Sequence, residues 1–192
     1  MDEMVERAMT RWPDVPDCYG WLRLDARGCW RVGDGRGRFD PVTHRGLAAF
    51  LGRNYFRDTR GRCYVQNGPQ RVWVALELTP YVYRVSDDQI GLVSHDTGAP
   101  VRDVKRLVID SEGALVLDAQ PGVGVLLDRD LLGFVEQLQT AQGRSVDLQA
   151  LWEGALGSVL FQGQALPVTR AARADLPGLL GYNPDPQPTD RH

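Results

Sequence analysis

Leu107–Leu117 reads LVIDSEGALVL, and the chain contains a second version of this stretch, LRLDARGCWRV at Leu22–Val32. In both stretches apolar residues alternate on either side of an Asp-x-x-Gly turn, which is the pattern of a half-buried antiparallel hairpin. At an offset of 85 residues the Asp and Gly of the two turns coincide, and Trp30 meets Leu115. The repeat predicts two modules, each built around one such hairpin.

The order of elements after each hairpin also repeats: a loop, one main helix, a strand, a turn and another strand. The helical segments Arg45–Leu51 and Arg129–Val135 correspond at an offset of 84, and the last hairpins, Gly61–Gly68 and Gly157–Gln164, correspond at 96. The unequal offsets require insertions, and a chance likeness between two ββα pieces is the alternative. We expect the α+β class, with two related modules that are each an antiparallel sheet with one main helix packed on it.

The polar residues Ser86, Asp87 and Asp88 mark the expected boundary between the modules. They divide the chain into an N-terminal α+β module of hairpin, helix and hairpin at residues 1–85 and a C-terminal module of similar order at 86–174. Proline and glycine dominate after this point, a composition typical of disorder, so residues 175–192 are expected to form a disordered tail.

The two hairpins differ on their outer faces. Arg23 and Arg31 of the first hairpin become Val108 and Val116 in the second. A strand that is apolar on both faces is covered on both faces. We therefore expect the second sheet to be sandwiched between its own helix and the first module, while the first sheet keeps one arginine-bearing face in solvent.

Composition and charge argue against several classes of protein. The 192 residues carry a net charge of −3, whereas general nucleic-acid binding calls for a strongly basic domain. No apolar run approaches the ~18 residues of a membrane span, and the charged N-terminus lacks the apolar segment of a secretory signal. We expect a cytoplasmic protein that does not enter a membrane. Residues 1–85 hold 14 Arg against 10 acidic residues, so this half could face an anionic partner.

Residues that commonly carry chemistry are present without the spacing that chemistry needs. The residues that could bind zinc if they were grouped are Cys18, Cys29, His44 and Cys63. None of their spacings is that of a zinc site. Ser94, His95 and Asp96 are neighbours in sequence, which is not how catalytic triads are built. The glycine-rich loop at 33–37 lacks dinucleotide or phosphate-loop spacing. We predict no catalytic residues, no metal site and no cofactor.

One cluster, on the long strand expected at Gln70–Thr79, is assigned to binding. Alternation turns its valines and leucines to the core and directs Arg71 and Trp73 away from it. Trp73 is then either covered by the other module or part of an exposed aromatic patch. With the adjacent polar turn, the predicted ligand- or partner-binding residues are Gln66, Asn67, Gln70, Arg71 and Trp73.

The strand containing Trp30, the helix after Pro41 and the stretch YVQNGPQRVWVALELTP at Tyr64–Pro80 resemble a bacterial family of roughly 190-residue uncharacterised proteins, a domain of unknown function. The resemblance covers mainly residues 20–85 and contains no motif of known role. It implies a two-part α+β fold and implies no activity.

The leading functional hypothesis is a non-catalytic binding or protein-interaction protein, because no close grouping of acid, base and nucleophile is visible. Its partner is an unknown protein or a small anionic ligand, and a homodimer through a sheet edge or the Trp73 face is one form that such binding could take. The alternative is a small enzyme that acts on an anionic metabolite, with arginines of the N-terminal module as an anion clamp. A deep arginine-lined pocket would favour the enzyme, and a flat apolar patch would favour the partner.

Overall fold

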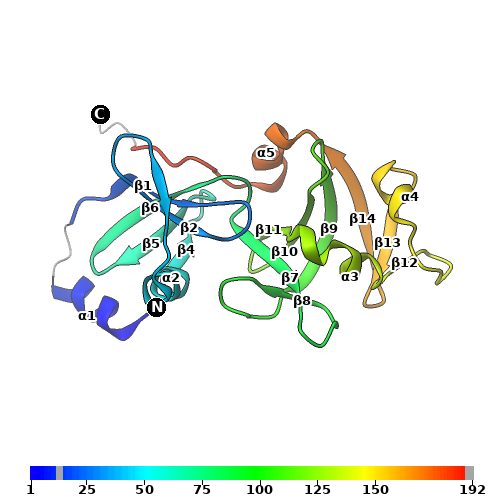
Figure 1. The fold of residues 1–192 in the computed structure, drawn as a ribbon, viewed down its shortest axis with the longest axis horizontal. Coiled ribbons are helices and arrows are strands. Elements are labelled where there is room, and N and C mark those ends of the chain that lie inside the picture. Colours follow the sequence, from blue (N-terminus) through cyan, green and yellow to red (C-terminus); the bar gives the residue numbers. More distant parts are fainter. Residues whose placement is uncertain (12–14, 189–192) are drawn as a thin grey trace. The chain divides into compact units, whose positions relative to one another are not determined.

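The computed structural model describes residues 1–11 and 15–188. These residues divide into two compact units, whose elements are labelled in Figure 1. Unit 1 holds Met1–Pro80 together with residues 181–188, and unit 2 holds Tyr81–Leu180. Each unit combines one sheet with a few short helices, so the predicted α+β class with two modules is confirmed.

Unit 1 contains a six-stranded sheet in the order β3-β2-β1-β6-β5-β4. Its strands are β1 (Cys18–Leu24), β2 (Trp30–Gly33), β3 (Phe39–Pro41), β4 (Tyr55–Arg57), β5 (Cys63–Asn67) and β6 (Gln70–Leu76). Its helices are α1 (Glu3–Arg11) and α2 (Arg45–Arg53). α2 begins after His44, whose Nδ1 accepts a hydrogen bond from the Leu47 backbone N–H at 3.1 Å. This bond satisfies one of the free N–H groups of the first turn.

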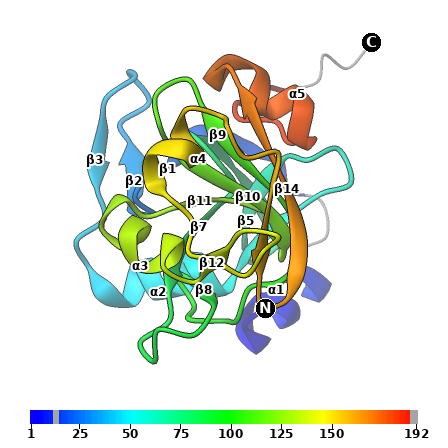
Figure 2. The ribbon, with the colours of Figure 1, turned by 90° about the vertical axis from the view of Figure 1, so that its right-hand side faces the viewer.

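Unit 2 contains an eight-stranded sheet in the order β12-β13-β14-β9-β10-β11-β7-β8. Its strands are β7 (Tyr81–Val85), β8 (Leu92–Ser94), β9 (Arg102–Asp110), β10 (Leu115–Gln120), β11 (Val123–Leu126), β12 (Leu138–Gln139), β13 (Ser158–Phe161) and β14 (Gln164–Ala171). Its helices are α3 (Leu131–Val135), α4 (Leu148–Trp152) and α5 (Leu176–Leu180), with 3-10 turns η1 (Asp128–Asp130) and η2 (Arg173–Asp175). Figure 2 shows how these strands curl around the interior of the unit. Among the described residues, no helix has the length and apolar character that crossing a membrane requires.

The two sheets share one topology. The order β11-β10-β9-β14-β13-β12 in unit 2 matches β3-β2-β1-β6-β5-β4 in unit 1, and every matched pair of strands runs in the same relative direction. The Leu24–Trp30 pair of unit 1 corresponds to the Ile109–Leu115 pair of unit 2, at the predicted offset of 85. β7 and β8 are additions at the β11 edge. The modules are therefore related in structure, and their origin by duplication stays a prediction.

The helix α4 explains why the offset between the modules changes along the chain. The turn that begins at Asp58 matches the one that begins at Thr140. In each turn the backbone N–H of the glycine three residues later donates a hydrogen bond to the carbonyl of the first residue. That match has an offset of 82. The last hairpins match at 94 instead of the expected 96, because the Tyr64–Trp73 pair corresponds to Ser158–Pro167. The insertion between these two points contains α4.

Both sheets are mixed, which corrects the expectation of purely antiparallel sheets. β6 runs parallel to β1, with Leu22 beside Val74, and β14 runs parallel to β9, with Leu107 beside Val168. Parallel neighbours require a long crossover, so they come from segments far apart in the sequence. Alternating apolar residues and turn residues in the sequence predict only antiparallel hairpins, whose strands are neighbours in the chain.

The two central hairpins close with the same turn. In each, the Oδ1 atom of the aspartate, Asp25 or Asp110, accepts hydrogen bonds from the backbone N–H groups of the second and fourth residues after it, at 2.8 to 3.0 Å. Gly28 and Gly113 have φ values of +80° and +85°, which glycine adopts without strain. The repeated Asp-x-x-Gly pattern is therefore a requirement of the turn.

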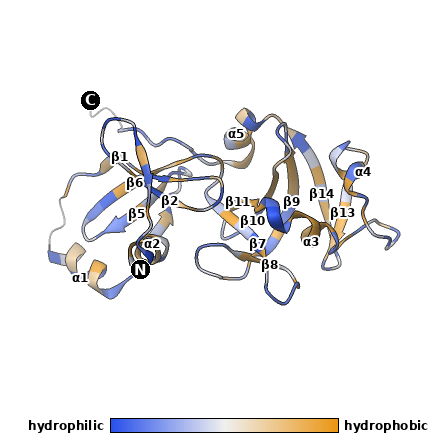
Figure 3. Cartoon of the chain, in the orientation of Figure 1, coloured by the Kyte–Doolittle hydropathy of each residue, from blue (hydrophilic) through white to orange (hydrophobic). Residues whose placement is uncertain are grey.

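The outer faces of the two hairpins differ as predicted. Val108 and Val116 are both 0 % exposed, whereas Arg23 is exposed and the Arg31 side chain is 37 % exposed. Figure 3 shows the hydrophobic colouring of β10 and β11 in unit 2. The expected burial of the valine pair is confirmed, and the sandwiching of this sheet by the first module stays a prediction.

The boundary between the units follows Pro80, where the sequence suggested residue 85. β7 pairs in parallel with β11, which places Tyr81 beside Gly124 and Val82 beside Val125. Since β7 comes directly after β6 in the chain but joins a different sheet, the polar residues that follow it end a strand and do not separate domains.

The segment expected to be a disordered tail has a defined structure as far as it is described. α5 buries Leu176 and Leu180. The chain then returns to unit 1, where the Asn183 N–H donates to the Gly61 carbonyl at 3.0 Å. A few apolar side chains and backbone bonds are enough to hold a proline-rich segment. Residues 189–192 of the expected tail lie outside the described residues.

The cysteines should differ sharply in reactivity. Cys63 is 0 % exposed, and this burial raises the pKa of its thiol to about 11. Cys29, by contrast, is exposed. Because Cys63 reacts only when the core opens, we expect iodoacetamide to alkylate Cys29 at least ~100-fold faster in the folded protein. Peptide mass spectrometry measures both rates, which should converge in denaturant. Equal rates in the folded protein would contradict the place of Cys63 in the core.

Candidate functional site

Trp73, the centre of the predicted binding cluster, is buried. Its exposure is 2 %, and its indole Nε1 donates a hydrogen bond to Asp17 Oδ2 at 2.9 Å. Tyr19 stacks on the indole with ring centroids 5.9 Å apart, and Tyr64 meets it edge-on at 5.3 Å. The alternative that Trp73 is exposed is therefore wrong. The aromatic rings in contact with it lie in unit 1.

The other predicted site residues lie together at the end of the β5–β6 hairpin, where Gln66 is opposite Arg71 and Asn67 is opposite Gln70, but they differ in exposure. Gln66 is 2 % exposed and its amide hydrogen-bonds within the β5–β6 turn. The Gln70 amide donates to a backbone carbonyl just before β1, at 3.0 Å. Asn67 and Arg71 are exposed. Gln66, like Trp73, therefore makes structural contacts, and Asn67 and Arg71 are the members of the cluster that reach solvent most fully.

Two guanidinium groups lie over the neighbouring rings of Tyr64 and Trp73. The guanidinium carbon of Arg71 lies 5.0 Å from the ring centroid of Tyr64, and that of Arg62 lies 4.1 Å from the Trp73 ring. Tyr64 is directly opposite Trp73 in the β5–β6 pair, so these groups lie on one face of the sheet. Such contacts hold a planar guanidinium flat against a ring.

The same face of the sheet continues over β1 to β3. The Arg23 guanidinium carbon lies 4.2 Å from the Phe39 ring centroid, and Arg23 is beside Ala75 of β6 and opposite Arg31 of β2. Side chains that alternate with the core residues of these strands share this side. We call it the arginine–aromatic face; its residues are Arg23, Arg31, Phe39, Phe56, Arg62, Tyr64, Arg71 and Trp73.

The arginines of this face fall into two groups. Arg31 and Arg62 each pair with a carboxylate, and the Arg62 Nε donates to Asp58 Oδ2 at 2.8 Å. Burial acts to raise the pKa of Asp58, but hydrogen bonds from Arg62 and its charge outweigh this and hold the pKa below its usual value. Within residues 1–11 and 15–188, Arg23 and Arg71 have no carboxylate partner. Their N–H groups therefore remain available to an anion.

The matched positions in unit 2 carry different side chains. Ser158 and Pro167 occupy the positions of Tyr64 and Trp73, as the registers of the two hairpins show. Val108 occupies the position of Arg23. The arginine–aromatic face is therefore specific to unit 1.

Ser94, His95 and Asp96 are adjacent in unit 2 without forming a catalytic relay. Ser94 Oγ donates to Asp96 Oδ1 at 2.5 Å, and His95 Nδ1 is buried without a hydrogen-bond partner among the described residues. Burial and the nearby charge of Arg129 lower the pKa of His95. In the part of the chain that the structure describes, no group of His, Cys, Asp or Glu could hold a metal ion.

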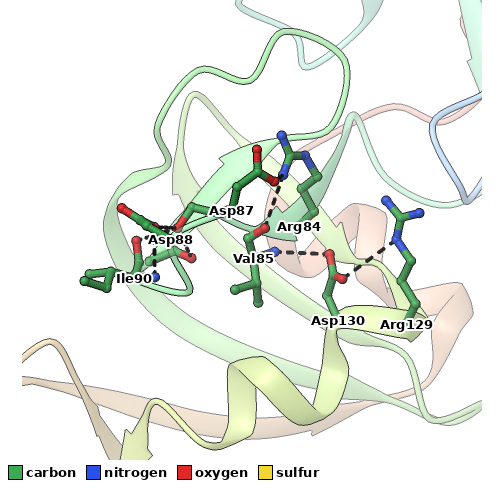
Figure 4. Close-up of polar contacts among 9 residues, drawn as sticks. Arg84, Val85, Asp87, Asp88, Ile90, Arg129 and Asp130 are labelled. Carbon is green, nitrogen blue, oxygen red and sulfur yellow. Dashed lines mark hydrogen bonds and ion pairs between the residues drawn. The ribbon is translucent and has the colours of Figure 1, made fainter.

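The other arginines near β7 have carboxylate partners, which Figure 4 shows. The Arg84 Nη1 lies 2.7 Å from Asp87 Oδ1, and Arg129 Nε lies 3.7 Å from Asp130 Oδ1. The second carboxylate oxygen of Asp130 accepts the Val85 backbone N–H at 3.1 Å. The Asp130–Val85 bond fastens β7 to η1, and the two ion pairs are local to β7 and η1, so we assign all three to the fold of unit 2.

Two hollows open on unit 2. One, of about 390 Å³, lies at the β9–β10 turn. The other, of about 270 Å³, is lined mainly by glutamines: Gln89, Gln137, Gln139 and Gln162. The predicted site residues do not line either hollow. Sequence reasoning missed both, because their walls come from turns that are distant in the sequence and share no motif.

Residues 1–187 match the model of a family described as "Protein of unknown function (DUF2946)". The chain belongs to this family. The expected resemblance to uncharacterised proteins is thereby confirmed at the level of a domain of unknown function. No curated protein matches the sequence.

A solved structure with low sequence identity has a similar fold. The crystal structure of a DUF1285 family protein from Silicibacter pomeroyi DSS-3 is similar with a TM-score of 0.51 and 12 % sequence identity. The likeness covers 87 % of this chain and 94 % of that chain. At this identity it shows a common fold and nothing about activity.

Proposed function

We propose that the protein is a non-catalytic binding protein that holds an acidic protein segment on the arginine–aromatic face. The observation that carries the proposal is that Arg23 and Arg71 lie over aromatic rings, at 4.2 Å and 5.0 Å, while no described carboxylate pairs with them. A guanidinium that already rests on a ring loses little freedom on binding, and its N–H edge suits a carboxylate.

The spacing of the two arginines favours an extended partner. Arg23 lies beside Ala75, and Arg71 is four residues further along β6, which is about 13 Å at the rise of a strand. The two guanidinium groups also rest on rings of different strands, Phe39 of β3 and Tyr64 of β5, so a segment with several carboxylates spans them better than one small anion. Unit 1 also has 14 Arg against 12 acidic residues in the sequence of 1–80 and 181–192, a balance that attracts an acidic partner.

The setting that we infer for this binding is a bacterial cytoplasm. A bacterial source is supported by the source of the structural relative. A reducing compartment is supported by Cys18, Cys29 and Cys63, which are all unpaired.

Titration with a hexaglutamate peptide tests the proposal. We expect binding that weakens as ionic strength rises, because exposed charges are screened. Arg23→Gln and Arg71→Gln should each weaken binding up to about fivefold, the effect of one exposed ion pair, and the double variant should weaken it further. Isothermal titration calorimetry measures the dissociation constants.

Arg36→Gln is the matched control, because Arg36 is exposed in the loop after β2 and no described side chain pairs with it. The proposal fails if Arg36→Gln weakens binding as much as Arg71→Gln does, since general charge would then explain the result. It also fails if glutarate binds as tightly as the peptide, which would indicate a site for a small anion.

A further inference from the structure

The hollow of about 390 Å³ in unit 2 has an apolar floor and a charged rim. Leu115, Leu126 and Leu131 line it from β10, β11 and α3. Glu112, Asp128 and Arg173 also line it, from the β9–β10 turn, η1 and η2. A volume of this size is in the range of small-molecule sites, about 300–1,000 Å³.

The arginine at the rim is already paired. Arg173 Nε donates to Asp110 Oδ2 at 2.6 Å, and its Nη1 lies 2.6 Å from Glu112 Oε2. The Asp110 side chain is 0 % exposed, whereas Glu112 and Asp128 are exposed. Arg173 therefore pairs with two carboxylates, and the charged residues that line the hollow, Glu112, Asp128 and Arg173, sum to a net charge of −1. This charge attracts a cation and repels an anion.

The matched positions of unit 1 carry residues of opposite character. In the central hairpins, Glu112 corresponds to Arg27 and Leu115 corresponds to Trp30. Trp30 is 4 % exposed and meets Tyr55 edge-on at 5.3 Å, so a bulky indole occupies this part of unit 1. The acidic rim and the smaller side chain at the floor are therefore features of unit 2 alone, and the shared fold does not require them.

An acidic residue specific to unit 2 also lines the hollow from η1. In the matched strand pairs β2–β3 and β10–β11, Pro41 of β3 corresponds to Val125 of β11, an offset of 84 residues. The same offset makes Asp128 the counterpart of His44. His44 caps α2 through its ring nitrogen, whereas Asp128 is the first residue of η1, and its side chain has no hydrogen-bond or ion-pair partner among the described residues. Asp128 is thus free to meet a ligand.

We propose that this hollow is a binding site for a small organic cation with an apolar body, such as an arylalkylammonium. The ammonium group lies at the rim beside Asp128 and Glu112, and the apolar body rests on the three leucines. The site is separate from the arginine–aromatic face of unit 1 and selects the opposite charge, so its test does not depend on the function proposed above.

An NMR titration of the full chain with phenethylammonium tests the site. Saturable shifts are expected at the backbone amides of Gly113, Ala114 and Leu131, with a dissociation constant on the order of a millimolar for a ligand of this size. Asp128→Asn should weaken binding about threefold to fivefold, because one exposed charge pair is lost. Glu112→Gln should weaken it more, because it also releases Arg173 toward the ligand.

Asp103→Asn is the matched control. It removes the same charge from an exposed residue of unit 2 that does not line the hollow, and asparagine accepts its φ of +48°. Binding should be unchanged in this variant. Two neutral or negative analogues complete the test: 2-phenylethanol should bind more weakly than phenethylammonium, and phenylacetate more weakly still.

Three results would overturn the proposal. The first is the absence of saturable shifts at the amides around the hollow. The second is equal weakening by Asp128→Asn and Asp103→Asn. The third is binding of phenylacetate at the same amides as tightly as phenethylammonium, because Arg173 would then be the group that recognises the ligand.

Discussion

Replacing Trp73 with alanine should lower the free energy of unfolding by about 3–5 kcal/mol, the usual cost of removing a large buried aromatic side chain. The substitution leaves a cavity between Tyr19 and Tyr64 and removes the ring beneath Arg62. It also leaves Asp17 Oδ2 without its indole donor. Denaturant unfolding followed by circular dichroism measures the loss.

Two further variants separate burial from aromatic chemistry. Trp21 is 46 % exposed on β1, so Trp21→Ala should cost about 1 kcal/mol or less. Trp73→Phe should cost an intermediate amount, since it keeps a ring against Tyr19 and Tyr64 but loses the hydrogen bond to Asp17. If Trp73→Ala kept full stability and lost hexaglutamate binding, Trp73 would be a binding residue and its structural role would be contradicted.

Replacing Asp110 with alanine should cost about 2–4 kcal/mol, because several donors lose one buried acceptor at once. Asp110 Oδ1 accepts two backbone N–H groups of the β9–β10 turn, and Oδ2 accepts the Arg173 guanidinium at 2.6 Å. The side chain is 0 % exposed, so water cannot readily replace it. Thermal and denaturant unfolding of the variant measure the effect.

Asp34 provides the matched control, because its Oδ1 accepts two backbone N–H groups in the same way, at 2.7 and 3.2 Å, in an exposed turn. Asp34→Ala should cost no more than about 1 kcal/mol, since water takes the place of the carboxylate. Asp110→Asn should fall between the two, because it keeps an acceptor and loses the charge facing Arg173. Equal costs at Asp34 and Asp110 would refute burial as the cause.

The central hairpins show how far local patterns reach. A period of two and an Asp-x-x-Gly turn predict two antiparallel hairpins, and in the structure Leu24 lies opposite Trp30 and Ile109 opposite Leu115. The turn sets the register of a hairpin, and a shift of one residue would turn the whole apolar face outward. The same reasoning predicted the burial of Val108, which is confirmed.

The candidate site could be predicted only in part. Alternation places Arg71 and Trp73 on one side of β6, but exposure depends on what covers that side. Tyr19 and Asp17 reach Trp73 because β1 runs parallel to β6, and a parallel pair leaves no local pattern in the sequence. For the same reason the sequence did not reveal that Arg23 shares this face with Arg71.

The α+β class, the two modules, the central hairpins and the contrast between Arg23 and Val108 could all be predicted from the sequence, because each depends on neighbours in the chain or on the side chain alone. The parallel strand pairs, the return of residues 181–188 to unit 1 and the grouping of Glu112, Asp128 and Arg173 around one hollow are visible only in the folded protein. These features join segments that are far apart, and such contacts form when whole sheets close around a core, which no local period records.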